Sequence, residues 1–170
     1  MVVYGSGGHT GEMLPVVHSL AQTSKIQKIT YVSANTDTIS RLQPAPQNVK
    51  DITHVFLPRS RNVGQSFITS VFTTFNSLLA AIPLAVHKPD LLLVNGPGVC
   101  FPVVISMFIG NLLGITNCSI VFIESFCRVE TLSLTGKLIY PLCDIFFVHW
   151  EKLAQMRKRA KLINIFHLNQ

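Results

Sequence analysis

Six short apolar runs alternate with longer helical stretches along this chain of 170 residues. The runs predicted as strands span residues 2–4, 29–32, 54–57, 91–95, 120–123 and 145–148. The stretches predicted as crossover helices span residues 12–22, 65–86, 101–113, 134–140 and 151–159. Such alternation is typical of βαβ units, whose right-handed crossovers make the strands parallel and place helices on both faces of the sheet. The sequence therefore predicts one α/β, Rossmann-like domain that takes in residues 1–170.

Two long uncharged segments raise the alternative of a membrane protein. No charged residue lies between Leu91 and Ile123, so hydropathy alone would indicate a membrane span. The run Asn95-Gly96-Pro97-Gly98 and Pro102 would break a spanning helix, which favours a buried strand, a loop, an apolar helix and a second buried strand. The helix at residues 65–86 is also uncharged, and we expect it to be buried against the sheet, with contact to a membrane surface as the alternative.

Composition and charge favour an anionic partner or a membrane face. Hydrophobic residues make up 48% of the chain and charged residues 13%, and 14 Lys and Arg against 8 Asp and Glu give a net charge of +6. The basic residues are scattered rather than interleaved with aromatic ones, so nucleic acid is the less favoured anion. The four cysteines, Cys100, Cys118, Cys127 and Cys143, have no metal-site spacing and are expected to be reduced core residues of a cytosolic domain.

A glycine-rich turn follows the first predicted strand. Gly5, Gly7 and Gly8 allow positive φ angles and close approach of a ligand, and Thr10 is predicted to cap the helix that follows. A helix start of this kind offers unpartnered N–H groups and a favourable dipole to an anion. The spacing only overlaps the dinucleotide fingerprint, and the second strand ends in Ser33, without the acidic residue that a nicotinamide or flavin site needs. The turn therefore predicts an anion site, with a tight turn that binds nothing as the alternative.

Polar residues follow several of the predicted strands at the point where each one ends. They are Gly5 to His9, Arg59 and Arg61, Asn95 to Gly98, and Glu124 with Ser125. Ligands of open α/β sheets bind outside the carboxyl ends of the strands. We therefore expect these residues to share one edge of the sheet and to form the functional site.

The residues resemble one known family, the membrane-anchored subunit of the dolichol-pathway UDP-N-acetylglucosamine transferase. The resemblance extends to about Trp150 and rests on six stretches in the family's order: Gly5-Ser6-Gly7-Gly8-His9-Thr10, Pro58-Arg59-Ser60-Arg61, Val71-Phe72-Thr73-Thr74, Lys88-Pro89-Asp90, Asn95-Gly96-Pro97-Gly98 and residues 124–133. It implies the amino-terminal, acceptor-binding half of a GT-B glycosyltransferase, inactive alone, whose partner subunit holds UDP-GlcNAc. The pair adds the second GlcNAc to dolichyl-diphosphate-GlcNAc at the cytosolic face of the endoplasmic reticulum membrane.

The resemblance also implies roles for the residues at the strand ends. Forming a β-linkage from an α-linked donor inverts the sugar carbon, so a base must take the proton of the acceptor hydroxyl. Glu124 is the preferred base and His9 orients the acceptor or its diphosphate; alternatively, Glu124 pairs with Arg128 or caps the turn after it. The acceptor diphosphate and sugar are assigned to Gly5, Ser6, Gly7, Gly8, Thr10, Arg59, Arg61, Asn95, Gly96, Gly98 and Ser125. No metal or other cofactor is expected.

Two departures from the family and two rival functions remain. The family's amino-terminal anchor has no counterpart here, which indicates a shortened chain, and the tail at residues 161–170 matches the family poorly. One rival is a stand-alone nucleotide-dependent Rossmann enzyme, which the missing acidic residue disfavours. The other is a non-catalytic scaffold that recruits a partner to the membrane.

Overall fold

The computed structural model describes residues 1–38, 40–61, 64–96 and 98–164, which form one parallel sheet flanked by helices. The seven strands of this part are β1 (Val2–Val3), β2 (Lys28–Ala34), β3 (Asp51–Leu57), β4 (Leu91–Asn95), β5 (Ser119–Ile123), β6 (Ile145–Val148) and β7 (Ala160–Leu162). Their order across the sheet is β3-β2-β1-β4-β5-β6-β7, and every pair is parallel. The predicted Rossmann-like parallel sheet is confirmed. Only β7 was not predicted, since its three residues lie in a run of basic side chains.

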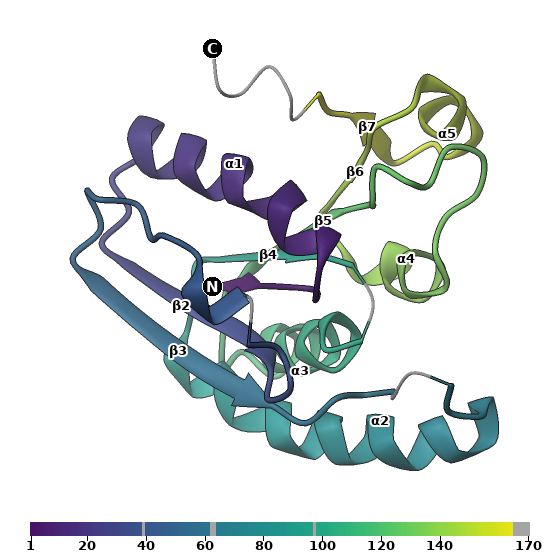
Figure 1. Cartoon of the computed structure of the whole chain (residues 1–170), viewed down its shortest axis with the longest axis horizontal. Helices are drawn as coiled ribbons and strands as arrows, with labels where there is room; N and C mark the ends of the chain where they lie inside the picture. The colour runs from purple at the N-terminus through teal and green to yellow at the C-terminus, as the bar shows by residue number, and fades with distance from the viewer. Residues whose placement is uncertain (39, 62–63, 97, 165–170) are drawn as a thin grey trace.

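The helices cover both faces of this sheet (Figure 1). They are α1 (Gly8–Thr23), α2 (Phe67–Ala81), α3 (Cys100–Leu112), α4 (Leu134–Ile139) and α5 (Glu151–Met156), with 3-10 turns η1 (Ser40–Leu42), η2 (Ile82–His87) and η3 (Tyr140–Leu142). Residues of α1 pack with one core cluster, and residues of α3, α4 and α5 with the other. Each predicted helix is present. The crossover from β2 to β3 contains η1 and, within the described residues, no longer helix.

Alternate residues of the strands pack into the two core clusters, one on each face of the sheet. Leu92 and Val94 of β4 join the cluster under α3, whereas Leu93 joins the cluster under α1. Burial on both faces explains why these strands are continuous apolar runs rather than alternating ones. The uncharged segment at residues 91–123 is thus a buried strand, α3 and a second buried strand, as predicted.

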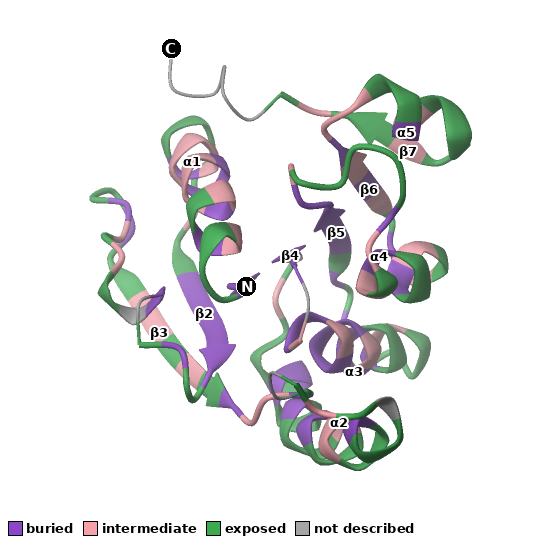
Figure 2. Cartoon of the chain, turned by 45° about the vertical axis from the view of Figure 1, so that its right-hand side comes forward, coloured by how far each residue is buried: buried purple, intermediate pink, exposed green. Residues whose placement is uncertain are grey.

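The prediction that the helix at residues 65–86 is buried against the sheet is wrong. Figure 2 shows α2 largely exposed. The large apolar side chains of α2 and the following η2 that face solvent are Ile68, Val71, Phe72, Phe75, Leu79, Ile82 and Val86, which we call the α2 ridge. The inner side of the helix carries small residues instead, with Ser77 and Ala81 fully buried. By length and composition alone, the helical segment Ile68–His87 could cross a membrane, and 28% of an 18-residue apolar window within it is buried.

Hydroxyl groups hold α2 in this orientation. Thr73 and Thr74 donate hydrogen bonds to the carbonyl of Ser60 at 2.6 and 3.0 Å, and Ser77 donates to the carbonyl of Pro58 at 2.9 Å. The chain therefore turns the polar side of α2 inward, onto the loop after β3, and the apolar side outward. Apolar periodicity located the helix correctly but could not tell which side packs on the protein.

The strand order reverses direction at the middle of the sheet. From β1 the chain moves outward through β2 and β3, then returns through α2 and η2 to β4, which pairs with the other side of β1. The crevice outside the carboxyl ends of β1 and β4 is therefore the topological switch point, where ligands of open α/β sheets bind. Gly5 and Asn95 lie there.

Candidate functional site

The glycine-rich turn opens directly into α1. Gly7 takes φ 71° and ψ −128° as the N-cap residue, and no side chain caps the helix. Ser6, Gly7 and Gly8 are exposed, and the first turn of α1 contains no acidic residue. The first N–H groups of a helix have no intrahelical partners. Because, among the described residues, no side chain caps this helix start and its first turn has no acidic residue, it can accept an anion.

Thr10 does not play its predicted role as the helix cap. It lies inside the first turn of α1, 2% exposed, and its hydroxyl donates to the carbonyl of Gly5 at 2.8 Å. The same oxygen lies 2.6 Å from the hydroxyl of Ser40. Its side chain thus braces the turn from the inside, and the helix begins earlier because glycine can supply the N-cap conformation on its own.

Two glycines make room for the His9 imidazole. A Cβ atom on Gly96, whose φ is 96°, would lie 2.6 Å from the Cγ atom of His9. A Cβ atom on Gly5 would lie 2.8 Å from the carbonyl oxygen of Asn95 and 2.9 Å from the Cβ of His9. Any larger residue at these positions would displace the ring. Gly5 and Gly96 therefore place the imidazole between the ends of β1 and β4.

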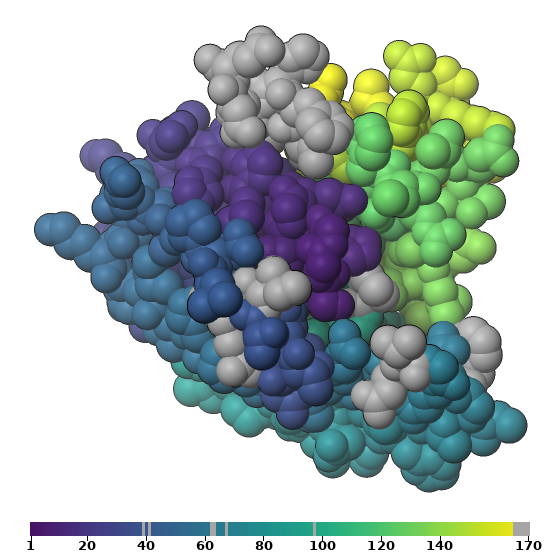
Figure 3. Space-filling view, in the orientation of Figure 1, coloured from purple at the N-terminus to yellow at the C-terminus, as the bar shows by residue number. Residues whose placement is uncertain are grey.

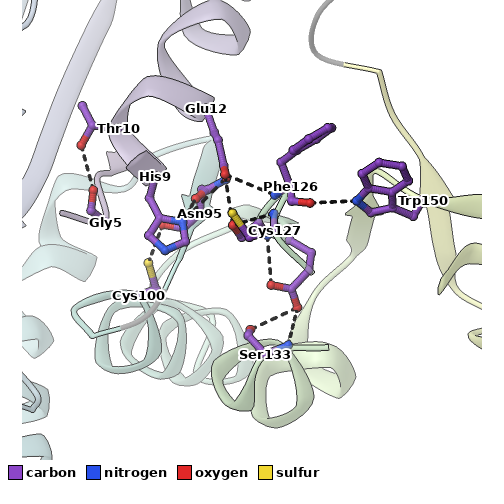
Figure 4. A network of polar contacts seen from close by, with 12 residues as sticks. Gly5, His9, Thr10, Glu12, Asn95, Cys100, Phe126, Cys127, Ser133 and Trp150 are labelled. Atoms are coloured by element: carbon purple, nitrogen blue, oxygen red, sulfur yellow. Dashed lines mark hydrogen bonds and ion pairs between the residues drawn. The ribbon is translucent and has the colours of Figure 1, made fainter. Parts of the chain in front are cut away.

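A carboxylate that the sequence analysis missed lies beside His9. The Glu12 Oε2 atom is 3.7 Å from His9 Nδ1, and it accepts a hydrogen bond from the Asn95 amide at 2.9 Å. Glu12 Oε1 accepts from the Ser125 hydroxyl at 3.0 Å and from the Phe126 backbone N–H at 3.2 Å (Figure 4). His9 and Glu12 are three residues apart, so once the helix is known to start at Gly8 they fall on one face. The wrong helix start hid this pair.

The pair shifts the protonation of both groups. Burial lowers the pKa of His9, but the Glu12 carboxylate and the Asn95 side chain outweigh it, so the pKa lies above its ordinary value. Burial would raise the pKa of Glu12, but hydrogen bonds with His9, Asn95 and Ser125 outweigh it and the pKa is lowered. Glu12 is therefore ionised near neutral pH, and its carboxylate stabilises the protonated form of His9.

Glu124 lies one strand further along the same edge and is deeply buried. Its side chain is 1% exposed, and Oε1 accepts from the Ser125 backbone N–H at 3.0 Å. Oε2 accepts from the backbone N–H and the hydroxyl of Ser133 at 2.9 and 3.1 Å, at the start of α4. A Cβ atom on Gly136 would come within 2.4 Å of this same oxygen. The geometry matches the alternative in which Glu124 caps the following turn.

The remaining predicted residues divide between the turn and other parts of the molecule. The Arg59 guanidinium donates to the Ser6 hydroxyl at 3.3 Å and so reaches the glycine-rich turn. Arg61 instead donates to the carbonyl of Gln65 at 2.8 Å, at the approach to α2. Gly98 has φ 76° and is half-buried next to α3, while Pro97 of the same motif lies outside the described residues. Figure 3 shows the surface hollowed between the start of α1, the loop after β5 and α2.

The cysteines follow the predicted pattern in part. Cys100, Cys118 and Cys143 are buried thiols, whereas Cys127 is exposed in the loop after β5, so the prediction of a core position is wrong there. Burial raises the pKa of Cys100 to about 12. Within the described ranges, no group of three or more His, Cys, Asp or Glu side chains could hold a metal ion.

Comparison with known proteins assigns the chain to a family. A family model described as "Oligosaccharide biosynthesis protein Alg14 like" matches residues 1–166. The chain belongs to the Alg14 family. This match extends past Trp150 into most of the tail that the sequence analysis set apart; residues 165–170 of that tail lie outside the described residues. The resemblance predicted from six short stretches is confirmed.

Named relatives of this Alg14-family chain are transferase subunits. The chain is 39% identical over 166 residues to the UDP-N-acetylglucosamine transferase subunit ALG14 of Candida albicans, covering 96% of this chain and 76% of that protein. It is 42% identical over 168 residues to the human subunit of the same name, covering 91% and 76%. A crystal structure of MurG from Acinetobacter baumannii is similar in fold, with TM-score 0.59 and 18% identity over 87% of this chain and 40% of MurG.

Proposed function

We propose that this chain is the acceptor-binding half of a two-chain glycosyltransferase, which transfers GlcNAc from UDP-GlcNAc to dolichyl-diphosphate-GlcNAc. The names of its relatives support UDP-GlcNAc as the donor and the role of this chain as one subunit of the enzyme. The chain spans about two fifths of the MurG chain that shares its fold, which fits half of a GT-B enzyme. The observation that carries the proposal is the uncapped start of α1 beside the His9 imidazole, at the switch point of the sheet.

The acceptor diphosphate binds at the glycine-rich turn in this proposal. Gly8 and His9 begin α1, so their N–H groups point out of the helix start toward an anion. Arg59, held against Ser6, adds a cation that can donate charge-assisted hydrogen bonds to phosphate oxygens. The arrangement matches a doubly charged diphosphate better than a neutral sugar, whose hydroxyls would not gain from the helix dipole.

The geometry favours His9 over Glu124 as the general base. Both oxygens of Glu124 are occupied by the start of α4 and the backbone of Ser125, whereas His9 is 22% exposed next to the turn. Its Nδ1 atom bonds Asn95, and nothing in the described chain hydrogen-bonds to Nε2. Nε2 removes the proton of the acceptor hydroxyl as that oxygen bonds the donor sugar carbon from the face opposite UDP. The bond to UDP breaks with its electron pair, UDP leaves, and the configuration inverts.

The α2 ridge is the surface that meets the endoplasmic reticulum membrane in this proposal. Its large apolar side chains stand in solvent, from Ile68 at 80% to Leu79 at 51% exposed. No charged residue lies between Arg61 and His87, and the cations Arg61 and Lys88 flank the ridge at its two ends. Apolar side chains flanked by cations suit the boundary between acyl chains and anionic headgroups on the cytosolic side. A lipid-linked acceptor could then reach the site without leaving the bilayer.

Reconstitution of the two chains tests the proposal. This chain is purified with the candidate UDP-GlcNAc-binding subunit, and transfer to a short-chain lipid-diphosphate-GlcNAc is measured with each protein alone and with both. Transfer that requires both supports the half-enzyme; transfer by this chain alone contradicts it. His9→Ala is expected to abolish most transfer, and His18→Ala, on the same helix but at the carbonyl of Pro44, serves as the matched control. Full activity of His9→Ala would favour the non-catalytic scaffold.

A further inference from the structure

Glu12 joins three separate segments at the switch point. It projects from α1, and its two oxygens accept hydrogen bonds from Asn95 at the end of β4 and from Ser125 and Phe126 in the loop after β5 (Figure 4). The three donors are fixed in the fold: Asn95 is fully buried, Ser125 is 7% exposed, and the Phe126 carbonyl accepts from the Trp150 indole N–H at 2.8 Å. A carboxylate with this many rigid donors has one orientation available to it.

That orientation determines which atom of the Asn95 amide faces His9. A carboxylate oxygen can only accept a hydrogen bond, so the amide nitrogen of Asn95 must point at Glu12 Oε2. The amide oxygen then points at His9 Nδ1, 2.8 Å away. An amide oxygen can also only accept, so Nδ1 must carry a proton. In the neutral ring the other nitrogen, Nε2, is left with its lone pair free.

We propose that Glu12 is a positioning residue, which acts through the Asn95 amide to keep the His9 proton on Nδ1 and the basic lone pair on Nε2. The proposal rests on the role of His9 as the base in the proposed function. Gly5 and Gly96 support it, because they pack against the imidazole and hinder its rotation. The acidic groups that face the ring are Glu12 from α1 and Glu124 from the loop after β5, with the neutral Asn95 from β4. Of these, Glu12 alone orients the amide.

Glu12→Gln removes the constraint without removing the side chain. If the introduced glutamine keeps its oxygen toward Ser125 and Phe126, its amide nitrogen meets the Asn95 nitrogen, and two donors face each other. Asn95 must then flip, which presents its nitrogen to His9 Nδ1 and transfers the neutral ring's proton to Nε2. We expect kcat to fall roughly 100-fold, the lower end of what a positioned general base contributes, with little change in KM. The acid limb of kcat/KM moves to lower pH, because a carboxylate beside the imidazole is lost.

Swapping the two groups should restore the network. In the double variant Glu12→Gln with Asn95→Asp, the introduced glutamine keeps its oxygen toward Ser125 and Phe126 and donates its amide nitrogen to the introduced aspartate, which accepts from His9 Nδ1. Every hydrogen bond and the net charge are retained. We expect kcat to recover at least roughly tenfold over Glu12→Gln, within the coupling range of residues that share one network. The acid limb should return to the parent pH or above it. Glu130→Gln, in the exposed loop after β5, is the control and should change neither quantity.

Nitrogen-15 NMR of the imidazole gives a readout that does not depend on transfer. The signals of His9, assigned by their loss in His9→Gln, should show a protonated Nδ1 in the parent and in the double variant, and a protonated Nε2 in Glu12→Gln. Protonation of Nδ1 that persists in Glu12→Gln, with an unmoved acid limb, overturns the proposal. If the proton moves to Nε2 in Glu12→Gln while kcat stays constant, the result supports the positioning role of Glu12 and contradicts the role of His9 as the base. Should Glu12→Gln fail to fold, the double variant decides, and protonation of its Nε2 overturns the proposal.

Discussion

The α2 ridge makes a quantitative prediction about membrane binding. Phe72 is 75% exposed and Phe75 is 60% exposed, so neither side chain contributes most of its apolar area to the folded protein. Full burial of a Phe side chain is worth roughly 1.5–3 kcal/mol, so the exposed parts of these two carry about 2–4 kcal/mol between them. If both enter the apolar part of a bilayer, replacing them with Ser should weaken membrane partitioning by about 30- to 700-fold.

Vesicle sedimentation measures this effect. The double variant Phe72→Ser with Phe75→Ser is compared with the parent on vesicles of phosphatidylcholine and phosphatidylinositol, and its Tm is expected to change little because both side chains are exposed. Leu42→Ser is the matched control, since Leu42 is 83% exposed but lies in η1, outside the α2 ridge. Equal partitioning of the double variant and the parent would refute the assignment of the ridge to the membrane. An equal loss for Leu42→Ser would also refute it.

Three further predictions concern the site itself. Gly96→Ala combines a φ of 96° with a Cβ atom 2.6 Å from the His9 ring, so we expect transfer to fall at least roughly tenfold and Tm to drop, measured by initial rates and thermal unfolding. Glu124→Gln leaves one of its backbone donors, such as that of Ser133, facing an amide nitrogen, at a cost of about 1–3 kcal/mol in urea unfolding; an unchanged midpoint would contradict the buried cap. Because its pKa is raised, His9 contributes to the free energy of unfolding; this contribution is fully present below the unfolded value of 6.5 and is lost as pH rises through the folded value. Because its pKa is lowered, Glu12 contributes stability that is present above 4.5 and is lost as pH falls through the folded value. The difference in free energy of unfolding between the parent and His9→Gln, measured by urea unfolding, should therefore be larger near pH 5.5 than at pH 8.5.

The sheet and its functional edge could be predicted because they depend on local sequence signals. Strands that are buried on both faces are continuous apolar runs, and the residue after each run must lie at the same edge of a parallel sheet. This reasoning from sequence alone predicts that Gly5, His9 and Asn95 lie together. It also placed Glu124 there correctly, but proximity to a site does not determine whether a carboxylate faces the ligand or the protein.

The errors arose where a tertiary contact outweighed a local preference. Thr10 has the chemistry of a helix cap, yet glycine supplied the turn and the threonine hydroxyl bonded the backbone inside. That shift of the helix start concealed Glu12, whose role depends on donors from β4 and from the loop after β5. The orientation of α2 was equally hidden, because an apolar stripe and a hydroxyl stripe on one helix do not reveal which of them packs against the rest of the protein.

The hydroxyl-lined inner side of α2 has a consequence for the proposed contact between this helix and a membrane. A helix that packs through apolar side chains loses its hydrophobic stabilisation in hydrocarbon, because separation from the protein no longer exposes those side chains to water. The bonds from Thr73, Thr74 and Ser77 to the loop carbonyls behave in the opposite way, since a less polar environment strengthens them. Adsorption onto a bilayer would therefore tighten the attachment of this helix to its own domain, and the proposed acceptor site would keep its shape.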